Sequence, residues 1–116
     1  MEPLSFRRGK GPEFKVRERV IKMLERYGWI VKIVHGSMYQ SGFPDLYCTH
    51  KKYGPRWIEV KLPNMEGSRW TAEQRKWFPI LAENGTPIWV ITNDTEYEYR
   101  KLFANDNWFE YMLMKS

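Results

Sequence analysis

The chain has 116 residues and is 42% hydrophobic, so it can bury one core. We expect a single domain that folds without disulfide or metal cross-links. Its one cysteine, Cys48, excludes an internal disulfide, and the chain shows no signal peptide or long apolar span, which predicts an intracellular protein without a membrane anchor. A formal net charge of +5 favours a polyanionic partner.

The chain begins with a segment, residues 1–12, that we expect to be a basic flexible arm. It carries Arg7, Arg8 and Lys10 among glycines and a proline, and these cations are candidates for DNA contact. Residues 13–27 follow as a predicted helix, because apolar side chains recur at helical spacing along one face. That face is formed by Val16, Val20, Met23, Leu24 and Tyr27.

Successive residues of a helix are rotated by about 100°, which places Glu13 on this apolar face and directs Glu18 away from it. Glu13 is therefore a candidate acid for a functional site. The alternative is a favourable charge at the helix N-terminus after Pro12, and the sequence leaves both open. On the exposed side of the same helix, Arg17 is a candidate for DNA contact.

A strand is predicted over residues 29–34, followed by a loop rich in glycine and serine. In this loop Ser37, Tyr39, Gln40 and Ser41 offer neutral hydrogen bonds to a DNA backbone. His35, just before it, is a candidate for contact with DNA or the leaving group. The loop lacks a phosphate-loop lysine pattern, which argues against a nucleoside-triphosphatase.

Residues 46–50 and 56–62 are rich in aromatic and β-branched residues, and the short turn between them predicts an antiparallel hairpin. Side chains alternate along a strand, so Glu59 and Lys61 project to one face. Asp45 starts the first strand, and the antiparallel return brings the end of the second strand beside it. Three charged groups are expected to converge. The turn carries Lys51 and Lys52, candidates for DNA contact.

Two carboxylates and one lysine are the minimum equipment for metal-assisted phosphodiester hydrolysis. Asp45, Glu59 and the backbone carbonyl of Val60 are candidate ligands for Mg²⁺, and Lys61 would orient the attacking water or stabilise charge at phosphorus. The alternative is an ordinary turn and a solvated ion pair. Because the charges interrupt an apolar strand that looks buried on both sides, we favour the catalytic interpretation.

Residues 71–83 are predicted as a second helix, kinked by Pro79 and closed by Asn84 and Gly85. Gln74 fits a capping box with Thr71, in which it would help to start the helix. It also lies on the face expected to meet the sheet, where it would point toward the candidate site. The sequence leaves both roles open. A buried strand over 88–92 would pair in parallel with its predecessor through this crossover helix. Residues 94–104 are predicted as a further helix, and 106–114 are ambiguous.

The motif Gly42-x-Pro44-Asp45 followed by Ile58-Glu59-Val60-Lys61 resembles the PD-(D/E)xK nuclease superfamily. The segment Thr71-Ala72-Glu73-Gln74 resembles its VRR-NUC branch, which includes small phage-borne Holliday junction resolvases. The resemblance spans residues 13–92. It implies an α/β fold, a small mixed β-sheet flanked by helices in the α-β-β-β-α-β order of restriction endonucleases. It also implies Mg²⁺ or Mn²⁺ dependence, cleavage of branched or flapped DNA, and active-site roles for Glu13 and Gln74.

Residues 13–116 are thus predicted to form a single nuclease domain, a metal-dependent, structure-selective DNA endonuclease. The leading hypothesis is a homodimeric Holliday junction resolvase, in the cytoplasm or nucleoid, or in the infected host cytoplasm if the chain is phage-encoded. The alternatives are a flap or restriction-like nuclease, a non-catalytic nucleic-acid-binding module, and an interaction protein with an aromatic dimer surface. Arg69 completes the candidate DNA contacts. The many aromatic residues are expected in the core, although some rings could stack on exposed bases.

Overall fold

The computed structural model describes residues 11–34 and 42–114. The sequence predictions for the arm over 1–10 and the loop over 35–41 lie outside these described residues. They concern Arg7, Arg8, Lys10, His35, Ser37, Tyr39, Gln40 and Ser41.

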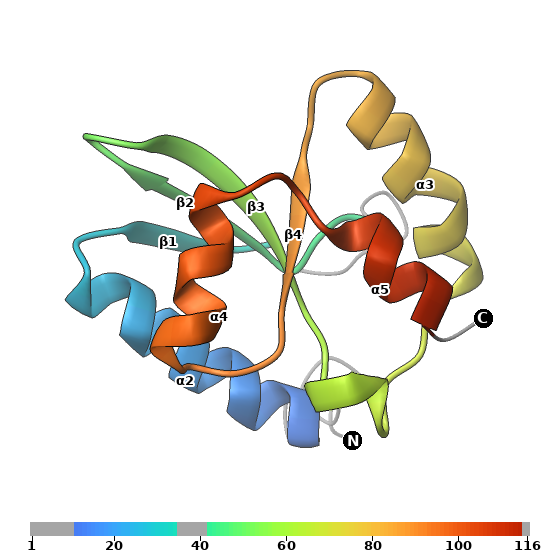
Figure 1. Ribbon diagram of the computed structural model, residues 1–116, viewed down its shortest axis with the longest axis horizontal. Coiled ribbons are helices and arrows are strands. Elements are labelled where there is room, and N and C mark those ends of the chain that lie inside the picture. The colour runs from blue at the N-terminus through green and yellow to red at the C-terminus, as the bar shows by residue number, and fades with distance from the viewer. Residues whose placement is uncertain (1–10, 35–41, 115–116) are drawn as a thin grey trace, which may run out of the picture.

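A four-stranded sheet forms the centre of the described structure, with strand order β1-β2-β3-β4 (Figure 1). The first three strands are antiparallel, whereas β3 and β4 are parallel and are joined by helix α3. The predicted α-β-β-β-α-β order is confirmed. In chain order the elements are α2 (Pro12–Arg26), β1 (Ile30–Ile33), β2 (Leu46–His50), β3 (Gly54–Val60), η1 (Pro63–Met65), α3 (Ala72–Glu83), β4 (Ile88–Ile91), α4 (Glu96–Arg100), η2 (Lys101–Phe103) and α5 (Trp108–Met114).

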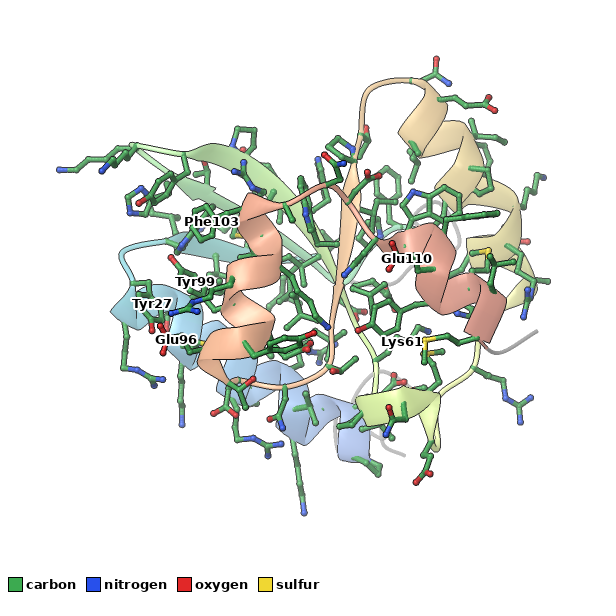
Figure 2. All side chains as sticks on the ribbon, viewed as in Figure 1. Tyr27, Lys61, Glu96, Tyr99, Phe103 and Glu110 are labelled. Carbon is green, nitrogen blue, oxygen red and sulfur yellow. The ribbon has the colours of Figure 1, made fainter. Side chains whose placement is uncertain are left out.

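Helices cover both faces of the sheet, so alternate residues of β3 enter two separate cores. Ile58 and Val60 pack in one cluster with residues of α2, α4 and η2. On this side Tyr27, just after α2, stacks on Tyr99 of α4 (Figure 2). Trp57 packs in the other cluster, which joins Phe78 of α3 to residues of β4 and α5. Burial on both faces, inferred from the apolar run, is thus confirmed for the end of β3.

Most predicted element boundaries differ from the structure by one residue or none. Strand β3 starts and ends two residues earlier than expected, so Lys61 and Leu62 follow the strand. Helix α3 spans Ala72–Glu83 with Pro79 inside it, as one element. Residues 106–114 contain helix α5, and the expected helix over 94–104 is divided into α4 and η2. Among the described helices, none is both long and apolar enough to cross a membrane.

Candidate active site

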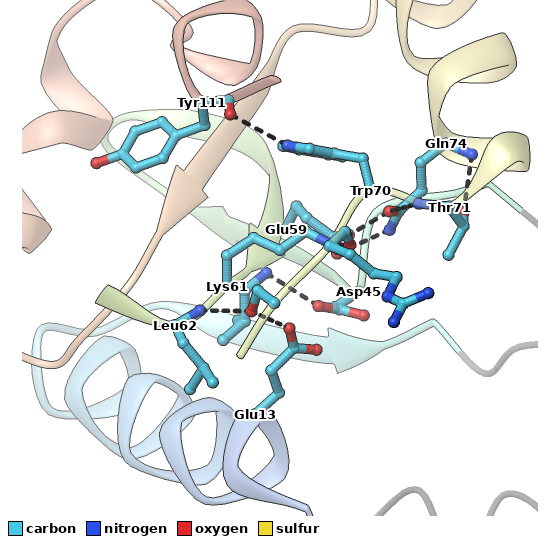
Figure 3. Close-up of polar contacts among 12 residues, drawn as sticks. Glu13, Asp45, Glu59, Lys61, Leu62, Trp70, Thr71, Gln74 and Tyr111 are labelled. Atoms are coloured by element: carbon cyan, nitrogen blue, oxygen red, sulfur yellow. Dashed lines mark hydrogen bonds and ion pairs between the residues drawn. The ribbon is translucent and has the colours of Figure 1, made fainter. Parts of the chain in front are cut away.

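Asp45 lies beside the end of β3, where the antiparallel register predicted it. Leu46 pairs with Ile58, which places the residue before β2 next to the residues after Ile58. The backbone N–H of Val60 donates to Asp45 Oδ2 at 2.9 Å (Figure 3). This bond fixes the carboxylate at the sheet end where Glu59 and Lys61 lie.

Glu59 and Lys61 form a buried ion pair on the α3 side of the sheet. The Lys61 Nζ to Glu59 Oε2 distance is 3.4 Å, and each side chain is only 3% exposed. Lys61 Nζ also donates to the backbone carbonyl of Arg69 at 2.8 Å and to Gln74 Oε1 at 3.1 Å. It lies 4.5 Å from the centre of the Trp70 ring. The ammonium group is therefore held from several sides.

Gln74 makes the capping-box hydrogen bonds and also contacts the two charged side chains of the site. In the capping box, its backbone N–H donates to Thr71 Oγ1 and its Oε1 accepts from the Thr71 N–H, each at 3.1 Å. Its Nε2 donates to Glu59 Oε2 at 2.9 Å. Because N3 of the helix faces back toward the cap, one side chain can serve the helix start and the acid together.

Two carboxylates share one lysine at the site, because Asp45 lies half-buried beside the buried pair of Glu59 and Lys61. Burial, and then the charge of Asp45, raise the pKa of Glu59 well above its usual range, against the opposing effect of Lys61. Burial also raises the pKa of Asp45, opposed by the Val60 N–H and by Arg17. Glu59 Oε1 is buried without a hydrogen-bond partner. An unpartnered carboxylate oxygen in such a position is costly unless a cation or donor meets it.

Glu13 reaches the site indirectly. It accepts a short hydrogen bond from Ser68 Oγ, and Ser68 Oγ in turn accepts from the Leu62 N–H at 2.9 Å. Glu13 therefore touches the segment that follows Lys61, and it affects Asp45 and Glu59 through its charge. Its position on the inner face of α2 agrees with the helical spacing.

The segment from Leu62 to Trp70 supplies site groups that sequence reasoning missed. The Arg69 carbonyl and the Trp70 ring hold Lys61, and the Trp70 Nε1–H donates to the Tyr111 carbonyl of α5 at 3.1 Å. Within the segment, Met65 is fully buried with a positive φ of 63°. Strained, buried backbone of this kind persists where the surroundings enforce it, often at functional sites. No hydrophobic period marks this segment.

The candidate DNA contacts divide into two groups. Arg17 is half-buried on α2 and close enough to favour the charged form of Asp45, and exposed Arg69 adjoins the Lys61 contact. Lys51 and Lys52 lie in the β2–β3 turn, at the opposite end of the hairpin from Asp45. Glu59 lies six residues beyond Tyr53, the last residue of the turn, which is roughly 20 Å at the rise of a β-strand. The two lysines therefore do not line the same site.

Across the described residues, no group of three or more His, Cys, Asp or Glu side chains is arranged to hold a metal ion. The acids that converge at the sheet end are Asp45 and Glu59. The backbone carbonyl of Val60 is the further ligand that the sequence suggested. The Val60 N–H points to Asp45, and the C=O of a strand residue points to the same neighbour as its N–H.

Comparison with known proteins identifies the fold. No protein-family model matches the sequence, and no curated protein is significantly similar to it. The structure is similar to a solved VRR_NUC domain, with a TM-score of 0.60 and 19% sequence identity, over 77% of this chain and 92% of that one. The chain thus has the fold of a VRR-NUC domain. This confirms the fold that the motifs around Asp45 and Glu59 predicted.

Proposed function

We propose that the protein is a divalent-metal-dependent DNA endonuclease whose active site is formed by Asp45, Glu59 and Lys61. The observation that carries this proposal is the buried, unpartnered Oε1 of Glu59, beside the half-buried carboxylate of Asp45 and one buried lysine. The VRR-NUC fold supports it, because the name of the similar domain refers to a nuclease.

The residues present fit a hard divalent cation. Both side-chain donors are carboxylates, and burial together with their mutual repulsion disfavours their charged forms without a cation. Asp45 Oδ1, Glu59 Oε1 and the Val60 carbonyl would hold Mg²⁺ or Mn²⁺, with water in the remaining positions. When bound, such an ion would polarise the phosphate and lower the pKa of a water that attacks phosphorus.

The protein's own groups have distinct tasks in this proposal. Lys61 keeps a positive charge next to the reacting phosphate, where it orients the attacking water or stabilises charge at phosphorus. Gln74 and the Arg69 carbonyl fix the direction of the ammonium group. Arg17 and Arg69 supply charge for the DNA backbone at the mouth of the site. Glu13 positions the segment after Lys61 through Ser68.

For the substrate, we propose branched DNA, with a four-way junction cut by a homodimer as the first choice. A domain of this size has little surface for reading a base sequence, and a symmetric pair of sites could nick two strands. The net charge of +5 favours the polyanion. Flap DNA and plain duplex are the alternatives.

One experiment tests the activity and the substrate together. The protein and its Asp45→Ala variant are incubated with labelled junction, flap, single-stranded and duplex DNA, in Mg²⁺, Mn²⁺ or EDTA. We expect paired, metal-dependent nicks in the junction by the wild type only. Cuts confined to flap or duplex would overturn the junction assignment and leave the nuclease. Metal-independent binding without cleavage of any substrate would overturn the nuclease and leave a DNA-binding module.

A further inference from the structure

Exposed aromatic rings gather at the hairpin end that lies away from Asp45. Tyr27, Tyr53 and Phe103 are 45%, 38% and 46% exposed, although they belong to three separate segments. Tyr53 contacts Phe103 edge-on with ring centres 4.8 Å apart. Tyr27 stacks on Tyr99 at 3.9 Å, and Tyr99 contacts Phe103 at 5.3 Å (Figure 2). The three exposed rings are thus linked by direct ring contacts, with the buried ring of Tyr99 between Tyr27 and Phe103.

Lysines border these rings. Lys51 and Lys52 are exposed in the β2–β3 turn, and Lys52 Nζ lies 5.6 Å from the centre of the Tyr53 ring. We call the set Tyr27, Lys51, Lys52, Tyr53 and Phe103 the hairpin-end patch. Of the acids on α4, Glu96 pairs with Arg100 and Glu98 pairs with Lys101. Among the described residues neither Lys51 nor Lys52 pairs with an acid, so the patch presents two free cations beside open rings.

The rings are held in place before any ligand binds. The Arg56 side chain donates to the Tyr53 carbonyl at 3.0 Å and to the Leu102 carbonyl at 2.9 Å, so it ties the turn to η2. Tyr27 has one face covered by Tyr99 and is still nearly half exposed, which leaves its other side to solvent. Rings fixed in this way lose little conformational freedom when a flat group stacks on them.

Fixed aromatic rings beside cations suit the unpaired bases of a single DNA strand. Every base has a flat face, so stacking on Tyr or Phe tolerates any sequence, and lysines follow the phosphates. Bases in a duplex are already stacked on one another and offer no free face along the helix. An apolar protein partner would not require the exposed lysines at the edge of the rings. The charge therefore favours nucleic acid over a protein partner.

We propose that the hairpin-end patch binds an unpaired DNA strand that extends from the cleaved branch. This inference rests on the proposed nuclease function, because the patch and Glu59 lie on the same hairpin. Their separation of roughly 20 Å along the strand corresponds to about six stacked nucleotides. Substrates that carry a single-stranded tail longer than about six nucleotides should therefore bind better than blunt ones of the same sequence.

Binding is measured first, in EDTA, by the anisotropy of a labelled twenty-nucleotide oligo-dT. Replacing Tyr53→Leu together with Phe103→Leu removes the rings and keeps apolar bulk, and we expect affinity to fall roughly 10-fold. Lys51→Gln with Lys52→Gln should reduce the slope of log affinity against log salt by about 1.4. Phe109→Leu is the matched control, because this ring is 57% exposed on α5, outside the patch. It should bind as the wild type does.

The outcomes separate this inference from the nuclease proposal. Unchanged oligo-dT affinity in the ring and lysine variants would overturn the patch, even if the protein cleaves DNA. Light scattering that shows a dimer lost only in the ring variants, with oligo-dT affinity unchanged, would assign the patch to a protein interface. If the wild type cleaves nothing, the nuclease proposal fails, and the oligo-dT comparison still decides whether the patch binds single strands.

Cleavage of blunt and tailed substrates is the last measurement of this experiment. We expect the ring variants to cut blunt junction DNA at the wild-type rate, because the substitutions leave Asp45, Glu59 and Lys61 untouched. The same variants should lose the advantage that a ten-nucleotide tail gives the wild type. An equal loss on blunt and tailed substrates would contradict the patch as a site for the unpaired strand.

Discussion

Among the described residues, two buried glutamates pair with a lysine, and they differ in how completely their oxygens are satisfied. Glu98 is 6% exposed, and its Oε1 accepts from the N–H and the hydroxyl of Thr92 at 2.8 and 2.9 Å. Its Oε2 pairs with Lys101, which also donates to the Tyr111 hydroxyl. Both oxygens have partners, so the fold alone accounts for this charge.

Glu59 is 2% exposed, and only one of its oxygens is satisfied. It pairs with Lys61 and lies at the same site as the half-buried carboxylate of Asp45. A buried pair with all its hydrogen bonds stabilises a particular packing, whereas an unpaired excess of charge is retained against a cost in stability. The comparison assigns Glu98 a structural role and supports the proposal that Glu59 binds a cation.

The largest expected effect is on cleavage. Asp45→Asn and Glu59→Gln keep the shape of each side chain but remove its charge, and we expect single-turnover cleavage in Mg²⁺ to fall on the order of 10³-fold. Glu98→Gln should retain cleavage when assayed at a temperature where the variant is folded. A variant of Glu98 that lost cleavage as completely as Glu59→Gln would remove the distinction between the two pairs.

Stability should change in opposite directions at the two acids. Glu98→Gln breaks a satisfied buried pair and should lower the free energy of unfolding by about 3 kcal/mol. Burial raises the pKa of Glu59 above its ordinary value of 4.5. The folded metal-free protein therefore binds more protons than the unfolded chain. Its free energy of unfolding then falls as the pH rises above 4.5. Glu59→Gln should therefore be more stable than the wild type above neutral pH in EDTA.

Chemical denaturation across a pH series provides the measurement. The advantage of Glu59→Gln should narrow as pH falls toward 4.5, because the wild-type carboxyl is then protonated in both states. Saturating Mg²⁺ should stabilise the wild type and leave Glu59→Gln unchanged. A Glu59→Gln variant that is less stable than the wild type at every pH would show that this acid, like Glu98, is structural.

Trp70 offers a smaller test of how Lys61 is held. Trp70→Leu removes the ring beside the ammonium group, and we expect the cleavage rate to fall about 10-fold with little change in KM for DNA. Trp108→Leu is a matched control, since Trp108 packs in the same cluster against Phe78 without a contact to Lys61. Equal losses of rate in the two variants would attribute the effect to general loosening of the cluster.

The smallest effect separates the two roles of Gln74. Thr71→Ala removes the helix cap and should cost about 1 kcal/mol of stability, while the contacts of Gln74 with Glu59 and Lys61 remain. Gln74→Ala should lower stability similarly and also reduce the cleavage rate about 10-fold. Thermal melts measure the stability of both variants, and single-turnover assays measure their cleavage rates. A full cleavage rate in Gln74→Ala would leave only the capping role.

Strand periodicity explains why much of the site could be predicted from the sequence. Alternation placed Glu59 and Lys61 on one face, and the hairpin brought Asp45 beside the end of β3, which the Val60 hydrogen bond bears out. The helical stripe selected Glu13 over Glu18 for the inner face. These inferences depend on regular geometry over short stretches of chain, which a sequence pattern encodes directly.

The remaining contacts follow from tertiary packing of an irregular segment. The residues between Leu62 and Trp70 show no hydrophobic periodicity. The left-handed backbone conformation at Asn64 and Met65 could not be predicted from a glycine, because neither residue is one. The hydrogen bond from Ser68 to Glu13 joins positions far apart in sequence, so neither local pattern predicts the other. For Gln74, the sequence offered two roles as alternatives, whereas the geometry allows one side chain to perform both.

The central claim, that Asp45 and Glu59 share a divalent cation, is tested most directly by calorimetric titration of Mn²⁺ into the wild type, Asp45→Asn and Glu59→Gln. The account predicts saturable binding to the wild type that is lost in each variant, while Glu98→Gln binds as the wild type does. If Asp45→Asn and Glu59→Gln both bind Mn²⁺ as tightly as the wild type does, the claim that these two acids share a cation is contradicted.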